Sequence, residues 1–129
     1  VKNKPPQNEA VLTHYIVRKR KNNKSYCYDM EVENAKPAKM TYRIMNQSDN
    51  YYLLEIELHT GRHHQIRSQL SKIGSPVKGD LKYGFPRSNP GGGIHLHARE
   101  ISFIHPVQKK PLKIIAPPPD DTLWNVLTT

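Results

Sequence analysis

The chain lacks the features of secreted, disulfide-bonded and membrane-spanning proteins. Its single cysteine, Cys27, excludes an internal disulfide and fits a reducing compartment. No apolar run approaches the length of a membrane span, and no signal-peptide pattern is present. We therefore expect a cytoplasmic protein with no membrane association.

Acidic residues are also scarce. The chain has 11 Asp and Glu against 20 Lys and Arg, a formal net charge of +9. Such an excess on a small domain favours a surface for polyanions, whose binding weakens as salt rises. The charge predicts RNA as the partner, and the alternative is a charge balance that only keeps the chain in solution.

Apolar residues are few for an independent fold. At 129 residues the chain has the length of one domain, but hydrophobic residues make up only 36% and prolines number 11. We therefore expect a moderate core and marginal stability.

The first two thirds of the chain read mainly as strands. Residues 11–17 have strand composition, and the basic run 18–24 is a candidate hairpin tip. That run is either a solvated charge cluster or an RNA backbone contact. Residues 38–45 and 51–59 alternate as two strands, joined by the polar turn 46–50, and should pair antiparallel.

The last third contains a loop, two strands and a helix. Residues 84–93 carry three consecutive glycines and predict a mobile loop, which we expect to flank the RNA. The loop is not a phosphate-binding loop, because no Lys-Ser follows the glycines. Residues 94–104 and 112–116 predict strands. Residues 120–127 predict a closing helix with an acidic first turn.

A short helix lies between these parts. Ile66, Leu70 and Ile73 recur at helical spacing, and Gly74 stands where a left-handed cap belongs. A turn precedes the helix, and the positive end of a helix dipole favours a phosphate. The basic and polar side chains at this end are Arg62, His63, His64, Gln65 and Arg67. The alternative is a surface helix with ordinary basic residues.

The histidines allow a second interpretation. His95 and His97 alternate on a predicted strand and, with four other histidines, could suggest zinc. A His-x-His pair supplies only two ligands, and no Cys or Glu partner recurs at a ligand spacing. A zinc site is therefore disfavoured, although a metal-binding accessory domain stays open as a third class of function.

Several motifs together resemble the signature of the bacterial RNA pseudouridine synthases. They are the Thr-Gly-Arg-His-His-Gln-Ile-Arg string of 60–67, the Gly-Asp-x-x-Tyr-Gly of 79–84, the strand 35–43, and the Leu-His-Ala and Phe-Ile-His-Pro strings within 96–106. Residues 10–127 follow the family's order. The resemblance implies an α+β fold with a mixed, largely antiparallel sheet and packed helices.

The resemblance also implies that this chain is the C-terminal half of that catalytic fold. Residues 1–9 are expected to be a loose linker or strand remnant, and residues 10–129 the C-terminal part of the catalytic domain. The family's catalytic aspartate stands in a His-Arg-Leu-Asp stretch N-terminal to these motifs, and none of the five aspartates has that context. We expect the fragment to be inactive alone, and its exposed sheet edge to allow a dimer.

The resemblance assigns roles to particular residues. Arg67 is expected to hold the catalytic aspartate in an ion pair, because a guanidinium fork binds a carboxylate bidentately. Leu96 is expected to pack against the target uracil, and Arg62, His63, His64 and Gln65 to bind the substrate. No metal or organic cofactor is implied. The predicted RNA-binding residues are Arg18, Lys19, Arg20, Lys21, Lys78 and Lys82.

The expected reaction is the isomerisation of uridine to pseudouridine in ribosomal or transfer RNA. The sequence does not identify the RNA or the uridine. A non-catalytic RNA-binding module is the alternative function, because the segment with the catalytic aspartate is missing.

Overall fold

A computed structural model describes residues 1–128. It divides the chain into two compact units, residues 1–95 and the part from Leu96 onward, where length alone predicts one domain. Each unit is described by itself. No helix in the described part of the chain is long and apolar enough to cross a membrane.

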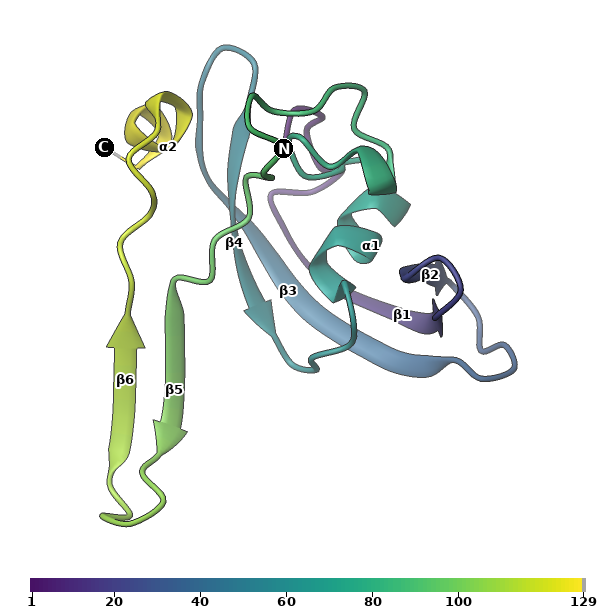
Figure 1. Ribbon diagram of the computed structural model, residues 1–129, viewed down its shortest axis with the longest axis vertical. Coiled ribbons are helices and arrows are strands. Elements are labelled where there is room, and N and C mark those ends of the chain that lie inside the picture. Colours follow the sequence, from purple (N-terminus) through teal and green to yellow (C-terminus); the bar gives the residue numbers. More distant parts are fainter. Residues whose placement is uncertain (129) are drawn as a thin grey trace. The chain divides into compact units, whose positions relative to one another are not determined.

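The first unit is built on a four-stranded antiparallel sheet with the order β2-β1-β3-β4 (Figure 1). The predicted strands and the antiparallel pairing of residues 38–45 with 51–59 are confirmed, and the α+β fold class is confirmed as well. The strands are β1 (Glu9–Lys19), β2 (Lys24–Tyr28), β3 (Lys36–Gln47) and β4 (Tyr52–Leu58).

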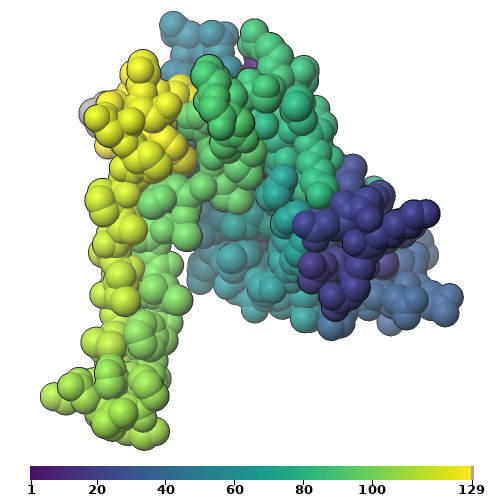
Figure 2. All heavy atoms as spheres, viewed as in Figure 1, coloured from purple at the N-terminus to yellow at the C-terminus, as the bar shows by residue number. Residues whose placement is uncertain are grey.

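The basic run forms the turn of the β1–β2 hairpin, as predicted. Lys19 pairs with Lys24 at the end of the ladder, and Asn23 adopts a left-handed conformation with φ 50°. Asparagine tolerates that region because its short polar side chain bonds locally. Figure 2 shows this turn, in dark purple, projecting from the first unit.

Helix α1 (Gln65–Lys72) lies against one face of this sheet (Figure 1). Leu70 joins Met40 and Val77 in the buried core, and Ile66 and Ile73 pack against it. The predicted apolar stripe is therefore confirmed. Gly74 closes the helix with φ 88°.

The helix end has the Schellman pattern of hydrogen bonds. The N–H of Gly74 bonds to the carbonyl of Ser71, and the N–H of Ser75 bonds to the carbonyl of Leu70. The predicted glycine cap is confirmed.

Residues 1–8 contain no helix or strand but are tied to the sheet. Val1 exchanges two backbone hydrogen bonds with Tyr52, at 2.7 and 3.0 Å, and Pro5 is buried. The predicted boundary at residue 10, with a linker before it and part of a catalytic domain after it, stays a prediction.

The second unit contains the hairpin of β5 (Glu100–Ile104) and β6 (Pro111–Ile115), followed by α2 (Thr122–Leu127). The carboxylate of Asp121 caps α2 by accepting from the N–H groups of Leu123 and Trp124. The strand from 112 and the closing helix are confirmed. The predicted acidic first turn was wrong, because the helix begins at Thr122 and Asp121 is its N-cap, so both aspartates precede the first turn.

The strand predicted from residue 94 begins only at Glu100, so that boundary was wrong. The N–H of Ala116 still bonds to the carbonyl of Arg99, at 2.7 Å. Residues 117–119 are prolines, which have no N–H donor and cannot extend the ladder further.

One face of the β5–β6 hairpin is entirely apolar. Ile101 stands opposite Ile114 and Phe103 opposite Leu112, and three of these four side chains are exposed. Figure 2 shows the hairpin, in light green, as a narrow arm. An exposed two-stranded ribbon is marginal by itself. The predicted dimer through a sheet edge stays a prediction.

Candidate active site

The turn before α1 is held by the side chain of Gln65. Its Oε1 accepts from the Thr60 hydroxyl at 2.8 Å and from the Arg62 N–H at 3.0 Å, while its Nε2 donates to the carbonyl of Lys39 at 3.1 Å. Gln65 is buried within this turn. A direct contact between Gln65 and substrate stays a prediction.

His64 is the last residue before the helix and has a left-handed backbone, with φ 51° and ψ 31°. This conformation is uncommon for residues other than glycine, and such strain clusters at functional sites. It turns the chain sharply, so that two side chains stack: the rings of His63 and His64 lie 3.7 Å apart.

Arg67 forms a bidentate ion pair with Asp80, a partner within the chain. Its Nε donates to Oδ2 and its Nη2 donates to Oδ1, both at 2.8 Å. The Asp80 side chain is only 1% exposed and that of Arg67 is 20% exposed. The hydrogen bonds to Asp80 raise the pKa of Arg67 further, so the guanidinium stays charged.

The resemblance implies that Arg67 pairs with an aspartate outside the chain. The structure shows that Asp80 occupies the side of the guanidinium that carries Nε and Nη2. The remaining nitrogen, Nη1, lies 3.3 Å from Nε2 of His64. An ion pair with a second carboxylate therefore has to form through the Nη1 end, and it stays a prediction.

Tyr83 lies beneath Arg67 and joins His64 to the sheet. Its ring centroid is 4.9 Å from the Arg67 guanidinium carbon, and its hydroxyl is 2.7 Å from Nδ1 of His64. The same hydroxyl accepts from the N–H of Ser25 in β2, at 2.9 Å. Burial is the main cause that raises the pKa of Tyr83.

Ser25 also holds His63. Its hydroxyl donates to the carbonyl of His63 at 2.7 Å, which leaves its oxygen to accept from Nδ1 of the same residue at 2.8 Å. Burial is the main cause that lowers the pKa of His63, followed by nearby cations. His63 is therefore neutral at physiological pH.

The protonation state of His64 follows from its partners. Because a guanidinium only donates, Nε2 of His64 has to accept, and Nδ1 carries the proton toward Tyr83. Burial, with Arg67 as the next cause, lowers the pKa of His64 to about 4.

Predicted RNA-binding residues from distant parts of the chain meet beside His63. Arg18 and Arg20 of the β1–β2 hairpin and Lys82 all lower its pKa through their charge, as Arg67 does. Lys24 extends over the Tyr83 ring at 5.4 Å. We call Arg18, Arg20, Lys24 and Lys82 the basic rim. The tertiary fold thus joins the hairpin turn to the helix end.

The other predicted RNA contacts have different surroundings. Lys19 lies over the Tyr26 ring at 5.0 Å, and Lys21 is exposed in the turn. The Lys78 ammonium donates to Asn89 Oδ1 at 2.6 Å, and Asn89 in turn donates to the carbonyl of Gly93. These bonds tie the loop 84–93, whose mobility stays a prediction.

Arg62 and Leu96 complete the predicted site residues. The Arg62 Nε donates to the carbonyl of Pro37 at 2.8 Å, which holds this side chain against the start of β3. Leu96 opens the second unit and is exposed. Its contact with uracil stays a prediction.

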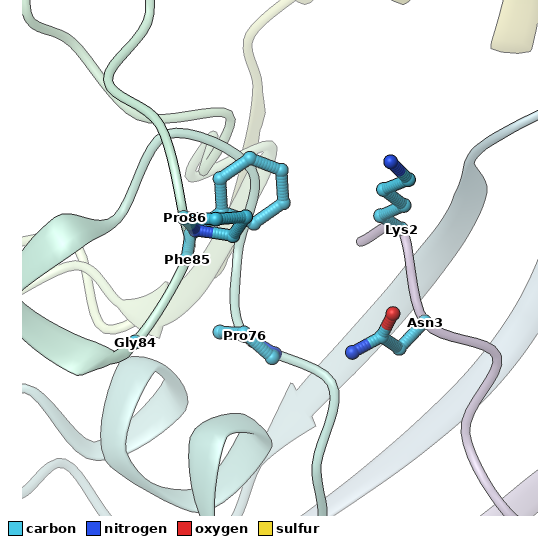
Figure 3. Close-up of a pocket in the computed structure, with 6 residues that line it drawn as sticks. All are labelled: Lys2, Asn3, Pro76, Gly84, Phe85 and Pro86. Atoms are coloured by element: carbon cyan, nitrogen blue, oxygen red, sulfur yellow. The ribbon is translucent and has the colours of Figure 1, made fainter.

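A small pocket of about 180 Å³ lies apart from these residues. Figure 3 shows Lys2 and Asn3 facing Pro76 and the segment 84–86 across its opening. None of the predicted site residues lines it. Within residues 1–128, no three His, Cys, Asp or Glu side chains gather in an arrangement that could hold a metal ion.

Three residues of this cluster were missed as functional candidates. Asp80 and Tyr83 stand in the Gly-Asp-x-x-Tyr-Gly motif, whose spacing from Arg67 is a usable signal. Ser25 has no such signal, because its contact with His63 spans 38 positions in the sequence.

Comparison with known proteins identifies the family. A family model described as RNA pseudouridylate synthase matches residues 1–72, more than half of the chain. The chain belongs to the RNA pseudouridine synthase family. An uncharacterised RNA pseudouridine synthase of Mycoplasma genitalium is 39% identical over 97 residues, covering 74% of this chain and 32% of the relative.

A second relative supports the family, and a solved structure supports the fold. The ribosomal large subunit pseudouridine synthase D of Xylella fastidiosa is 36% identical over 106 residues, with 71% of this chain and 32% of that protein covered. The structure of human RNA pseudouridylate synthase domain containing 1 superposes with a TM-score of 0.71 at 22% identity, covering 94% of this chain and 53% of its own. The chain spans about a third of the length of the curated relatives it matches.

Proposed function

We propose that this chain is part of an enzyme that converts uridine to pseudouridine in ribosomal or transfer RNA, in the cytoplasm and without a cofactor. In this isomerisation the C1′–N1 bond breaks and a C1′–C5 bond forms. The proton on C5 is lost and N1 gains one, so the base is neither oxidised nor reduced. Ribosomal RNA is supported by the name of the Xylella fastidiosa relative.

The observation that carries the proposal is the placement of Arg67. It stands on α1 within the family's string, charged and held by Asp80, and the basic rim lies beside the same helix end. A fixed guanidinium beside a cationic surface suits a reaction in which a carboxylate must stay ionised next to an RNA backbone.

Asp80 is not the nucleophile in this proposal. Both of its oxygens accept from Arg67 and its side chain is only 1% exposed, so neither oxygen is open to attack a ribose carbon. The catalytic aspartate comes from a segment outside this chain and pairs with Arg67 through Nη1. This aspartate is the nucleophile when the C1′–N1 glycosidic bond breaks. It is released when the turned base forms the C1′–C5 bond.

The basic rim holds the RNA. The target base has to leave its stack to reach a carboxylate, and cations beside the site hold the splayed backbone. Phosphate contacts of this kind release counterions, so the affinity falls as salt rises.

A non-catalytic RNA-binding module is the second candidate. It is favoured by the engagement of Asp80 with Arg67, because both oxygens of this aspartate already accept from the guanidinium. The chain by itself would then bind RNA and leave uridine unchanged.

One experiment separates the two candidates. RNA from cells that lack the gene, labelled with tritium at C5 of uracil, is incubated with this chain and with a longer protein that contains it. We expect tritium release from the longer protein and none from the chain. Release by the chain alone would contradict the external aspartate, and release by neither would leave the RNA-binding module. Mapping pseudouridine in total RNA with and without the gene identifies the uridine.

A further inference from the structure

The hydroxyl of Tyr83 connects three parts of the first unit. It accepts from the N–H of Ser25 in β2 and bonds to His64, the residue before α1. Tyr83 itself ends the short 3-10 helix Leu81–Tyr83, which begins directly after Asp80. Tyr83 is buried, so this hydroxyl is held by protein groups. The side chain is therefore a fixed point in the site.

The guanidinium of Arg67 is enclosed by Asp80, the Tyr83 ring and His64, and the Tyr83 hydroxyl contacts His64. Asp80 holds Nε and Nη2, the Tyr83 ring supports the plane from 4.9 Å, and His64 faces Nη1 from 3.3 Å. His64 can face Nη1 as an acceptor because its Nδ1 proton is directed to the Tyr83 hydroxyl. Removing that hydroxyl frees the His64 ring to rotate or to change tautomer.

We propose that Tyr83 is a positioning residue for Arg67, and that it acts through His64 to aim Nη1 at the catalytic aspartate. The inference rests on the proposed function, because orienting Nη1 of Arg67 matters for catalysis only if the catalytic carboxylate binds there. Tyr83 itself does not touch the reacting atoms in this scheme.

Positioning of this kind affects the rate more than the binding. A catalytic constellation has to be held within about 0.5 Å, and a displacement of about 1 Å can cost on the order of 100-fold in rate. The Tyr83 hydroxyl is buried and directed at protein groups, so its removal takes no contact from the RNA. The rate should fall while the affinity for RNA is retained.

The test compares Tyr83→Phe with Tyr42→Phe in the longer protein. Tyr42 is a matched control, because it is also buried and its hydroxyl also bonds to backbone, at Gln7 in the N-terminal segment. Single-turnover tritium release from the labelled RNA gives the rate, filter binding of the same RNA gives the affinity, and thermal melting confirms folding at the assay temperature.

We expect Tyr83→Phe to lower the single-turnover rate by about 10- to 100-fold, with RNA affinity unchanged. Tyr42→Phe should lower the melting temperature without lowering the rate. His64→Gln, which keeps one donor and one acceptor, should lose less rate than His64→Ala. In an Arg67→Lys background the guanidinium end is already gone, so adding Tyr83→Phe should cost much less than it does in the wild type.

Several outcomes would overturn the inference. They are a wild-type rate in Tyr83→Phe, an equal loss in Tyr42→Phe, or full additivity with Arg67→Lys. These leave the proposed function intact, because the wild-type protein still releases tritium. A wild-type protein that binds RNA and releases none refutes the proposed function, and the positioning inference falls with it.

Discussion

Each unit of this protein presents a hairpin with a basic turn, and the two hairpins differ in what surrounds them. The β1–β2 hairpin belongs to a four-stranded sheet, and its cations lie near His63. The β5–β6 hairpin is a two-stranded sheet with an exposed apolar face and two lysines, Lys109 and Lys110, in its turn. Two basic turns of similar composition therefore differ in context, because the first lies beside the candidate site and the second ends an exposed two-stranded hairpin.

The difference lies in how polar groups are satisfied. In the first unit the buried polar side chains of Asp80, Ser25 and Gln65 each have partners within hydrogen-bonding distance. In the second unit the hairpin side chains are mostly exposed. Buried networks position groups accurately, so we assign chemistry to the first unit and expect single substitutions to matter more there.

The largest effect is expected for Arg67→Ala. It leaves the Asp80 carboxylate buried without its partner, which should lower the free energy of unfolding by about 3–5 kcal/mol. Denaturant unfolding measures the change. Arg43→Ala is the control, because Arg43 pairs with Glu9 and Glu55 on an exposed surface and should change stability little. Equal losses of unfolding free energy in both variants would contradict the prediction that the buried Arg67–Asp80 pair stabilises the fold more than the exposed Arg43 pairs.

The next prediction compares the apolar side chains of the two units. Leu70→Ala in the core of the first unit should cost about 2–5 kcal/mol, whereas Phe103→Ala on the exposed hairpin face should cost less than about 1.5 kcal/mol in this chain. Chemical unfolding of both variants checks it. A larger loss for Phe103→Ala in a longer protein would show that another segment covers that face.

The third prediction concerns pH and the first unit. Because His64 has a folded pKa of about 4, below the ordinary value of 6.5, the unfolded chain binds the proton more readily. The stability from neutral His64 is fully present above pH 6.5 and is lost as the pH falls toward 4. The charged groups facing it are Arg67, Lys82 and Asp80, and neutral His63 stacks on it. Melting temperatures should fall over this window, and His64→Gln should flatten the fall.

A flat profile in the wild type would contradict the neutral assignment of His64. His14→Gln is a matched control, since burial also lowers the pKa of His14, where Asp29 opposes the shift. His14→Gln should also reduce the fall in melting temperature at acidic pH. Its effect should add to that of His64→Gln, because His14 contacts Gln69 and not the residues around His64.

The smallest effect is expected in RNA binding, where the two hairpin turns are compared directly. Replacing Arg18 and Arg20 with alanine should reduce the dependence of log affinity on log salt by about 1.4, if each contacts one phosphate of a single strand. Replacing Lys109 and Lys110 removes the same charge from the other turn and should change the slope less. Binding titrations at several salt concentrations measure both. Equal slopes would mean that net charge alone attracts the RNA.

Local patterns predicted most elements of the first unit. The alternation of residues 38–45 and 51–59 and the stripe of Ile66, Leu70 and Ile73 were enough to identify two strands and a helix, because these periodicities follow from backbone geometry. The strand expected at residue 94 failed for a reason outside its own pattern. A strand needs a partner, and the prolines after Ala116 end that partner.

The candidate site was predictable in part. The spacing of Arg67 from the glycine turn and the motif that follows were sufficient for the family, and the family is confirmed. The roles of Arg67, Leu96 and the basic residues stay predictions, since the resemblance alone supplies them. Asp80 is part of the Gly-Asp-x-x-Tyr-Gly motif, but its ion pair with Arg67 was not predicted. The pair depends on the directions of the two side chains, which sequence spacing does not provide.

The sequence by itself determined the charge, the periodicity of the helix and strands, and the motifs that mark an RNA pseudouridine synthase, because each of these is a property of neighbouring residues. Only the tertiary structure decided that Asp80 holds Arg67, that Ser25 joins His63 and Tyr83, and that Arg18 and Arg20 meet Lys82 at one helix end. The hydrogen bond between Ser25 and Tyr83 alone joins residues 58 positions apart. These contacts depend on how the sheet and helix pack, and that packing is set by the whole core rather than by any local segment.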